Sequence, residues 1–392
     1  MGRTFLTVAV SALFLVGCAS QQPSKRTSAK SFSPTSATLS AAAASTMRVH
    51  FINVGQGDAT LIEFPCAAML VDAGGETSHD VNSGALLMAY LEAFFDRRKD
   101  LNRTLALFVL THPHKDHTLN VPMVLSRYKI RNALDNGLRK GSGRFGQVAL
   151  QTKAKQDASM QYRAVRLSQV PNKTGLTGPI IDPIACNRID PRISVLWGQI
   201  DKINSPFPKI AKEPNNHSLV LRIEFGKATV LLTGDLEHNA IPELLKKYSG
   251  TDALRAMAFQ AGHHGSANGI TTKLANAVSP SLTVISMGPP LARAQGRVFN
   301  AWDFGHPRRS HVSLLAKAMS SEKSIDRKGE KGVLVCVANG QRKFVMRRVK
   351  KPIYATGWDG NVVATFRSNG SIKVTTQFRK PTVGRLCRSG IS

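Results

Sequence analysis

The 392-residue sequence predicts an α/β fold, an αβ/βα sandwich of two mixed sheets flanked by helices, with a small β-rich extension at its C-terminal end. Two observations lead to this prediction. Segments with the alternation of β-strands and segments with helical spacing follow one another twice along the chain. The hydrophobic content of 42% also supplies enough apolar side chains for one domain of about 300 residues plus appendages.

The first half of the fold opens with three predicted strands. Apolar residues alternate at 47–54, 59–64 and 67–71, and turn residues separate these runs. Residues 84–97 then carry leucine, tyrosine and phenylalanine at helical spacing. The continuous apolar run at 105–110 predicts a strand that is buried on both faces. A β-meander, a helix and a buried strand are therefore expected in this order.

The second half repeats the alternation of strands and helices. Residues 218–225 and 228–233 form a predicted hairpin, and a helix at 242–247 follows it. Further strands are expected at 256–260, 282–286, 333–337, 343–347, 362–366 and 372–376. These elements place one folded domain at residues 48–330 and the β-rich extension at 331–392.

The stretch at 121–214 has a weaker pattern than the rest of the domain. A helix is predicted at 121–128, and the following residues are basic and polar around 139–155. We therefore predict that 121–214 is an insertion or a substrate-facing lobe.

The N-terminal 18 residues have the order of a secretory signal. Arg3 precedes an apolar run at 5–16, which is too short to stay in a bilayer as a spanning helix. Leu15-Val16-Gly17-Cys18 resembles a bacterial lipobox, which implies export and a lipid anchor on Cys18, at the outer membrane or in the periplasm of a Gram-negative cell. The alternative is an ordinary cleaved signal with an incidental cysteine. Residues 19–47 are rich in Ser, Ala, Thr and Pro and predict a flexible tether.

Four cysteines remain after Cys18. An even number in an exported protein allows one or two disulfides in any of three pairings, although a domain of this size is also compatible with four free thiols. Their spacing does not match a cysteine zinc site. These residues are Cys66, Cys186, Cys336 and Cys387.

The chain is strongly basic, with a formal net charge of +28. Such a charge attracts polyanions such as nucleic acid or anionic envelope polymers, and it is also compatible with a solvated surface that has no specific ligand. Residues 341–388 contain many lysines and arginines, and Asp359 is the only carboxylate in this segment. This strip is a candidate for contacts with a phosphate backbone.

A cluster of metal-binding residue types follows the buried strand at 105–110. His112, His114, Asp116 and His117 form an HxHxDH pattern. If His112 and His114 face one cation and Asp116 and His117 face another, the motif supplies ligands to two ions. Zinc accepts both imidazole and carboxylate ligands, so two divalent ions are the expected cofactors, with zinc as the first choice and manganese as the alternative.

With Asp72 after an early strand and Asp235 after a hairpin, this pattern resembles the metallo-β-lactamase superfamily over about residues 48–316. Other motifs look like the hydrolase domain of the competence-type DNA-uptake protein ComEC and its stand-alone relatives. They lie at 53–58 (NVGQGD), 215–221 (NNHSLVL), 262–266 (GHHGS), 305–307 (GHP) and 353–360 (IYATGWDG). The resemblance implies that the fold is the metallo-β-lactamase sandwich.

The resemblance also implies roles for the metal ligands. Asp235 would bridge both ions, and His263 is favoured over His264 as the remaining ligand of the second ion, with the other histidine left to contact a substrate oxygen. The third histidine of the first site is absent, because Pro214 or Asn215 occupies its place. Either His217 takes over this role, or solvent completes a weaker site that manganese can occupy.

The remaining candidates lie around the metals. Asp72 is expected to orient ligands, and Asn53, Asp58, Asn215 and Ser266 to line the pocket or support it. His306 is a candidate contact for a phosphate or a leaving group. Asp116 or Asp235 could accept the proton of the attacking water, while His264 or His306 stabilises the developing charge.

These features together predict a lipid-anchored two-metal hydrolase of phosphoesters and favour a phosphodiesterase or nuclease that acts on DNA. Two alternatives stay open. One is a hydrolase of cell-wall phosphoesters of the phosphorylcholine type, and the other is a non-catalytic basic lipoprotein that binds DNA or envelope polyanions. Hydrolysis of β-lactams is not favoured, because the closest motif resemblance lies elsewhere.

Overall fold

The structure, a computed structural model, describes residues 45–76, 78, 80–201, 210–289, 300–319, 327, 332–382 and 387. The predicted signal at 1–18 with Cys18 and all but the last three residues of the tether at 19–47 lie outside these residues, so they stay predictions. Within the described ranges, no helix is both long enough and apolar enough to cross a membrane.

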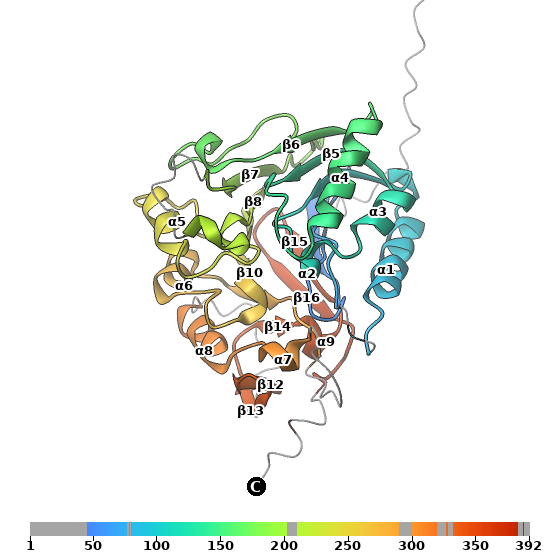
Figure 1. The fold of residues 1–392 in the computed structure, drawn as a ribbon. Helices are drawn as coiled ribbons and strands as arrows, with labels where there is room; N and C mark the ends of the chain where they lie inside the picture. Colours follow the sequence, from blue (N-terminus) through green and yellow to red (C-terminus); the bar gives the residue numbers. More distant parts are fainter. Residues whose placement is uncertain are drawn as a thin grey trace, which may run out of the picture. The chain divides into compact units, whose positions relative to one another are not determined.

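The first sheet has eight strands and joins the two ends of the described chain (Figure 1). β1 to β3 are antiparallel neighbours, and β3 to β6 run parallel. Its order is β16 (Ile372–Thr376), β15 (Val362–Arg367), β1 (Thr46–Phe51), β2 (Thr60–Glu63), β3 (Ala68–Val71), β4 (Thr104–Val109), β5 (Lys129–Asp135) and β6 (Gln161–Ala164).

The second sheet has six strands, and a separate hairpin lies in the chain between its strands β11 and β14. β7 to β9 are antiparallel, and β9, β10, β11 and β14 are parallel. The order is β14 (Ile353–Ala355), β11 (Leu282–Ile285), β10 (Ala258–Gln260), β9 (Ala228–Leu232), β8 (Val220–Phe225) and β7 (Arg192–Trp197). The hairpin consists of β12 (Val333–Gly340) and β13 (Lys343–Val349).

Three hydrophobic cores define the layers. One core lies between the sheets, where Phe51 of β1 and Phe225 of β8 are both fully buried. A second joins the first sheet to α1 (Ser83–Arg97), α3 (Val121–Arg127) and α4 (Arg144–Gln156). The third joins the second sheet to α5 (Ile241–Lys247), α6 (Thr272–Val278) and α8 (Arg309–Ala318). The two helical layers are visible on either side of the sheets in Figure 1, and the predicted sandwich is confirmed.

Two predicted boundaries are corrected by the sheet topology. Residues 121–214 are not an insertion, because they supply β5 and β6 to the first sheet and β7 to the second. The C-terminal part is β-rich as predicted, but it is not a separate extension: β14 joins the second sheet, and β15 and β16 join the first. The pairing partners of these strands are distant in the sequence, so the local pattern does not reveal them.

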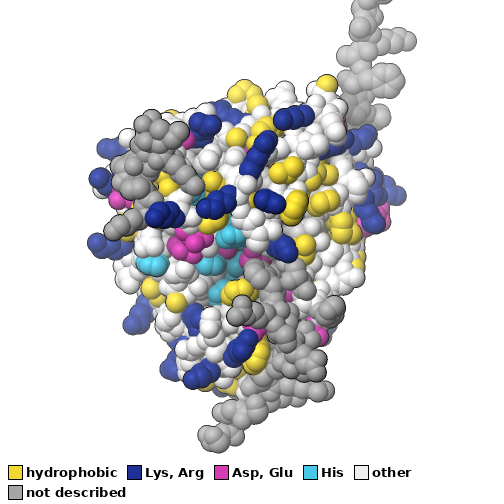
Figure 2. Space-filling model, in the orientation of Figure 1, with side chains coloured by type: hydrophobic (Ala, Val, Ile, Leu, Met, Phe, Trp, Pro, Cys, Tyr) yellow, Lys and Arg dark blue, Asp and Glu magenta, His cyan; other side chains and the backbone are white. Residues whose placement is uncertain are grey.

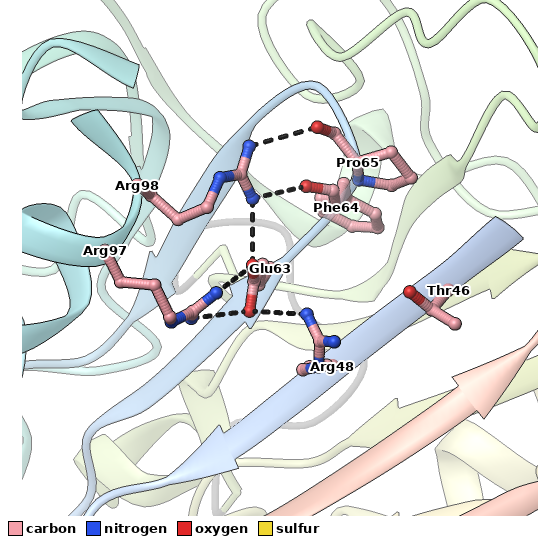
Figure 3. A pocket seen from close by; sticks show the side chains of 7 residues that line it. All are labelled: Thr46, Arg48, Glu63, Phe64, Pro65, Arg97 and Arg98. Atoms are coloured by element: carbon pink, nitrogen blue, oxygen red, sulfur yellow. Dashed lines mark hydrogen bonds and ion pairs between the residues drawn. The ribbon is translucent and has the colours of Figure 1, made fainter. Parts of the chain in front are cut away.

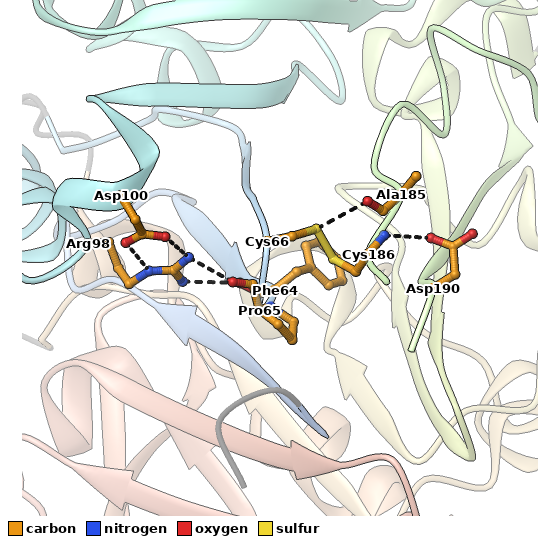
Figure 4. Close-up of a disulfide and its surroundings, with 8 residues drawn as sticks. All are labelled: Phe64, Pro65, Cys66, Arg98, Asp100, Ala185, Cys186 and Asp190. Carbon is orange, nitrogen blue, oxygen red and sulfur yellow. Dashed lines mark hydrogen bonds and ion pairs between the residues drawn. A yellow bond between two sulfur atoms is a disulfide. The ribbon is translucent and has the colours of Figure 1, made fainter. Parts of the chain in front are cut away.

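Two disulfides link the remaining cysteines. Cys66, in the turn between β2 and β3, is bonded to Cys186 in the segment before β7 (Figure 4). Cys336 of β12 is bonded to Cys387. The sequence allowed four free thiols, or one or two disulfides in three pairings, and the structure has two disulfides with this pairing. Because 120 residues separate Cys66 from Cys186, this bridge constrains a long stretch of the unfolded chain and is expected to contribute about 2–5 kcal/mol to stability.

A buried carboxylate ties α1 to the start of the first sheet. Glu63 of β2 accepts hydrogen bonds from Arg97 and Arg98, each at 2.9 Å, and Arg48 and His50 of β1 lie 3.4 and 3.3 Å away (Figure 3). The carboxylate and the three arginines line a pocket of about 250 Å³. Burial raises the pKa of Glu63, but the hydrogen bonds from His50 and Arg97 outweigh it and hold the pKa well below the usual range.

Replacing Glu63 by glutamine should therefore be strongly destabilising. In the variant, Asp100 is the remaining carboxylate partner of the Arg98 side chain, which is 8% exposed. Because a buried ion pair is broken, we expect the free energy of unfolding measured in urea to fall by about 3–5 kcal/mol. Because folding lowers the pKa of Glu63, the loss of stability should be complete above the pKa of a glutamate in the unfolded chain. It should shrink as the pH falls below that value. Glu92→Gln, which breaks an exposed pair with Arg103, should hardly change stability. Equal effects of both variants would contradict the prediction.

Candidate metal centre

The HxHxDH segment lies at the carboxyl end of β4, between the two sheets. Leu110 and Thr111 follow the strand, and the short helix α2 (Lys115–Thr118) begins after His114. His112 and His114 therefore project from the loop, while Asp116 and His117 project from α2. The loop is fixed from outside by a hydrogen bond from the backbone N–H of Gly143 to the carbonyl of Pro113, at 2.8 Å.

Asp72, at the end of β3, orients the segment from behind. Its carboxylate accepts hydrogen bonds from the backbone N–H and the hydroxyl of Thr111, both at 2.7 Å. It also lies 2.7 Å from Nδ1 of His117. Nε2 of His117 is thereby turned toward the centre of the site. Asp72 thus has the geometry expected of a residue that positions a ligand rather than one that binds metal.

Four side chains converge at one side of the centre. Nε2 of His117 lies 3.1 Å from Oδ1 of Asp235 and 3.2 Å from Nε2 of His264. Nε2 of His264 is 3.2 Å from Oδ2 of Asp116, and its Nδ1 faces the carbonyl of Ser286 at 2.7 Å. One donor atom from each of these four residues lies within 4.8 Å of all the others. Such a set of nitrogen and oxygen donors suits a divalent cation.

A second group lies on the other side of Asp235. Nε2 of His112 is 3.1 Å from Nδ1 of His114 and 3.8 Å from Oδ2 of Asp235. The carboxylate of Asp235 thus lies between the two groups: Oδ1 faces His117, whereas Oδ2 lies 3.5 Å from Nε2 of His264 and 3.8 Å from Nε2 of His112. A carboxylate in this position would be able to contact a cation held by either group.

The charges of the cluster are mutually dependent. Burial raises the pKa of Asp235, but His117 and His264 outweigh it and hold the pKa well below the usual range. Burial lowers the pKa of His264, whereas Asp235 and Asp116 bring it to a net value of about 9. Oδ1 of Asp116 is buried without a hydrogen-bond partner among the described residues. A cation would satisfy this oxygen and displace the protons that otherwise balance the carboxylates, so the residues fit a metal.

Two expectations for the ligands are corrected. The histidine that joins Asp116, His117 and Asp235 is His264, whereas Nε2 of His263 stays 3.8 Å from Asp235 and outside the four-residue group. His217 does not turn toward the site. Its Nδ1 accepts a hydrogen bond from the backbone of Ile200, and its Nε2 contacts the carbonyl of Ala211, both at 3.0 Å. Both ring nitrogens are therefore engaged by the backbone.

Glu237 was not predicted from the sequence, and it connects two residues that were. It accepts a hydrogen bond from Nδ2 of Asn215 at 2.8 Å and lies 3.6 Å from Nδ1 of His263. Oδ1 of Asn215 is buried and has no hydrogen-bond partner among the described residues. The position of Glu237, two residues after Asp235, was the only signal in the sequence that pointed to it. These three side chains form the rim beside Asp235.

Gln56 is a second residue that sequence reasoning left without a role. Its Nε2 lies 3.0 Å from Nδ1 of His306, and both side chains are buried. The ring of His306 stacks on Phe304 and lies 6.2 Å from the ring of His264, centroid to centroid. His306 therefore belongs to the wall of the site, as expected. Gln56 stands in the same loop motif as Asp58, which was the signal available for it.

The other residues that were expected at the pocket form hydrogen bonds that support the loops around it. Asn53 accepts from the backbone N–H of Gly55 and caps a turn. Asp58 is buried behind Asp72 and accepts hydrogen bonds from the side chains of Thr60 and Gln260. Burial, together with the nearby charge of Asp72, raises the pKa of Asp58 to about 6. The N–H of Ser266 bonds to the carbonyl of His263 and closes the turn that carries the two histidines.

Replacing Asp72 by asparagine should weaken metal binding. The variant keeps the size of the side chain and tolerates the positive φ of 59° at this position, but it withdraws the charge that orients His117. Loss of such a partner typically lowers affinity about 10- to 100-fold, which a competition titration with zinc would measure. Asp157→Asn, on the surface, is the matched control. Unchanged affinity in Asp72→Asn would show that Thr111 alone positions the loop.

The fold and this arrangement of ligands define the class of protein. The model of the Metallo-beta-lactamase superfamily matches residues 52–288, more than half of the sequence, and the chain belongs to this superfamily of metal-dependent hydrolases.

Particular relatives narrow the comparison. The chain is similar to ComE operon protein 3 of Bacillus subtilis, with 24% identity over 61% of this chain and 28% of that protein. It is also similar to Competence protein ComA of Neisseria gonorrhoeae, with 40% identity over 24% of this chain and 13% of that protein. Among solved structures, the metallo-beta-lactamase fold protein YhfI from Bacillus subtilis covers 61% of this chain and 85% of its own, with 14% identity and a TM-score of 0.35. The predicted likeness to competence-type hydrolases is confirmed, while the chain spans only 28% and 13% of the length of these two curated relatives.

Proposed function

We propose that this protein is an exported two-metal phosphodiesterase that cleaves nucleic acid, with DNA as its substrate. The observation that carries the proposal is the bridging position of Asp235 between two facing groups of donors. The net charge of +28 supports a polyanionic substrate. Relatives named for competence and recombination support nucleic acid in particular.

Each ligand group then has a role. His112, His114 and Asp235 would hold the first ion, and Asp116, His117, His264 and Asp235 the second. When bound, two such cations acidify water and offset the charge that gathers on phosphoryl oxygens. Zinc suits the imidazole-rich donors, and manganese suits the first group, which has fewer protein ligands.

The residues around the ligands contribute binding and proton transfer. Burial lowers the pKa of His306 well below its usual value, so its imidazole is neutral near pH 7. With Gln56 donating to Nδ1, the proton lies on Nε2, which can donate a hydrogen bond to a phosphoryl oxygen. Asp116, whose Oδ1 has no other partner among the described residues, is the proposed proton acceptor. His263 at the rim is proposed to contact a substrate oxygen.

The proposed location is outside the cytoplasm. The signal-like residues 1–18 support export, and Cys18 is the proposed lipid anchor to the membrane. The disulfides Cys66–Cys186 and Cys336–Cys387 support an oxidising compartment, because such bridges persist there.

The test compares metal-depleted protein with protein given zinc or manganese. Cleavage of bis-p-nitrophenyl phosphate and of a single-stranded DNA oligonucleotide would be measured, with bound metal determined in the same samples. Asp116→Ala should abolish both cleavage reactions, and Asp157→Ala, which removes a surface carboxylate, should leave them intact.

Metal-dependent cleavage of both substrates that Asp116→Ala abolishes supports the proposal. Stoichiometric metal binding without cleavage of either substrate rejects the nuclease and directs the search to cell-wall phosphoesters. Absence of metal binding rejects the enzyme altogether and leaves a basic binding protein.

A further inference from the structure

An exposed phenylalanine lies on the helix that packs against the metal-binding loop. Phe145, in the first turn of α4, is 71% exposed. Five large hydrophobic side chains are exposed in the described part of the chain, and three of them, Leu119, Phe145 and Val148, lie at the end of α2 and on α4. Exposed apolar side chains that gather in one place indicate a binding surface.

The same surface is positively charged. The guanidinium of Arg144 lies 4.9 Å from the ring centre of Phe145, and Lys115 and Lys140 are exposed nearby in the chain. Between residues 115 and 156 the only carboxylates are Asp116 and Asp135, and both are buried. Figure 2 shows yellow and dark blue side chains over α4, next to the cyan histidines of the site. We refer to Lys115, Leu119, Lys140, Arg144, Phe145 and Val148 as the α4 face.

The α4 face is continuous with the metal centre. The hydroxyl of Thr118 donates to the carbonyl of Gly143 at 2.8 Å, and Ser142 accepts from the backbone N–H of Lys115 at 3.2 Å. A Cβ on Gly141 would lie 3.2 Å from the ring of His114. The residues that lead into α4 therefore touch a ligand of the first group.

We infer that the α4 face binds single-stranded nucleic acid and guides it to the metal centre, with Phe145 as the stacking platform for a base. This inference rests on the proposed function and deepens it. A single strand presents both features that the face complements, phosphates for Lys115, Lys140 and Arg144 and an unpaired base for the phenyl ring. In a duplex the bases are stacked on one another, so Phe145 would gain little from it.

The test measures binding without cleavage. Fluorescein-labelled (dT)20 and a 20-base-pair duplex would be titrated with the purified full chain in EDTA, over a series of salt concentrations, by fluorescence anisotropy. Phe145→Ala should weaken (dT)20 binding about tenfold with little change in its salt dependence. Lys140→Ala should weaken binding of both nucleic acids and reduce the salt slope by about one. Leu334→Ala, which removes another exposed hydrophobic side chain, on β12 and 42% exposed, is the control and should bind as the wild type.

Phe145→Trp gives an independent readout. It should retain the affinity of the wild type, and the emission of the introduced indole should be quenched by (dT)20. If the wild type does not bind (dT)20, or if Phe145→Ala binds it as tightly as the wild type, the inference is overturned. Loss of self-association in Phe145→Ala with unchanged affinity for (dT)20 would also overturn it and identify a second copy as the partner. Because no divalent metal is present, failure of the proposed nuclease and failure of the α4 face are distinguished.

Discussion

Replacing Asp235 by alanine is expected to abolish turnover and to reduce the number of metal ions bound per chain. Oδ1 of Asp235 lies 3.1 Å from His117, and Oδ2 lies 3.5 Å from His264 and 3.8 Å from His112, so the variant would remove a proposed ligand from both groups at once. Since metal ions supply several kcal/mol of stabilisation to a phosphoryl-transfer transition state, we expect a loss of about a thousandfold or more in kcat/KM. Hydrolysis of bis-p-nitrophenyl phosphate would measure this loss, and titration with zinc would measure stoichiometry.

A matched variant separates this effect from a loss of charge. Asp252→Ala removes an exposed carboxylate and should change neither quantity. If Asp235→Ala keeps two ions per chain, the bridging position assigned to this residue is wrong. If it loses the ions but keeps turnover, the reaction does not depend on the metals.

Replacing Gly74 by alanine is expected to damage both stability and the metal centre. A Cβ on Gly74 would lie 1.6 Å from the carbonyl oxygen of Asp116, a backbone atom that cannot rotate away. That oxygen already accepts a hydrogen bond from the N–H of Asp58, and Gly74 donates to the carbonyl of Asp58, each at 2.8 Å. The three segments therefore meet with no room for a methyl group. We expect a loss of about 3 kcal/mol or more in urea unfolding and weaker zinc binding, because α2 must move.

Gly340→Ala is the control for this prediction. The nearest atom to a Cβ there is 3.8 Å away, on the side chain of Arg308, so the substitution should be tolerated. If Gly74→Ala unfolds at the same urea concentration as the wild type, the close contact is relieved by a small backbone shift and is not essential for the site.

Local patterns in the sequence predict much of this fold. The alternation in β1 to β3, the helical spacing in α1 and the apolar run in β4 all lead to the observed elements. Contacts between distant segments are not contained in such patterns. β6 and β14 have four and three residues, too few for a clear periodicity, and their sheets are chosen by packing. For this reason local patterns do not show that residues 121–214 and the C-terminal strands complete the two sheets.

The site shows the same limit. Spacing places His112, His114, Asp116 and His117 together, because all four belong to one loop and the helix that follows it. Spacing does not decide between His263 and His264. Both residues have a positive φ, 49° and 51°, and the conformation of such a turn determines which of the two rings faces the site. His217 lies in a 3-10 turn at 214–217 that directs it to backbone atoms, and Glu237 and Gln56 have roles only through their partners in space.

The pairing of β1 with β15 has a consequence for the order in which the protein can assemble. Thr46, among the first residues that the structure describes, pairs with Arg367, and the N–H of Asn53 in the loop after β1 donates to the side chain of Asn361. Closing a loop of almost the whole chain is entropically costly and slow. A chain that is synthesised or threaded through a membrane from its N-terminus would therefore hold β1 with one neighbour missing until its last strands arrive. The loop that carries Gln56 and Asp58 gains its final support only then, which delays a working hydrolase until nearly all of the polypeptide has been delivered.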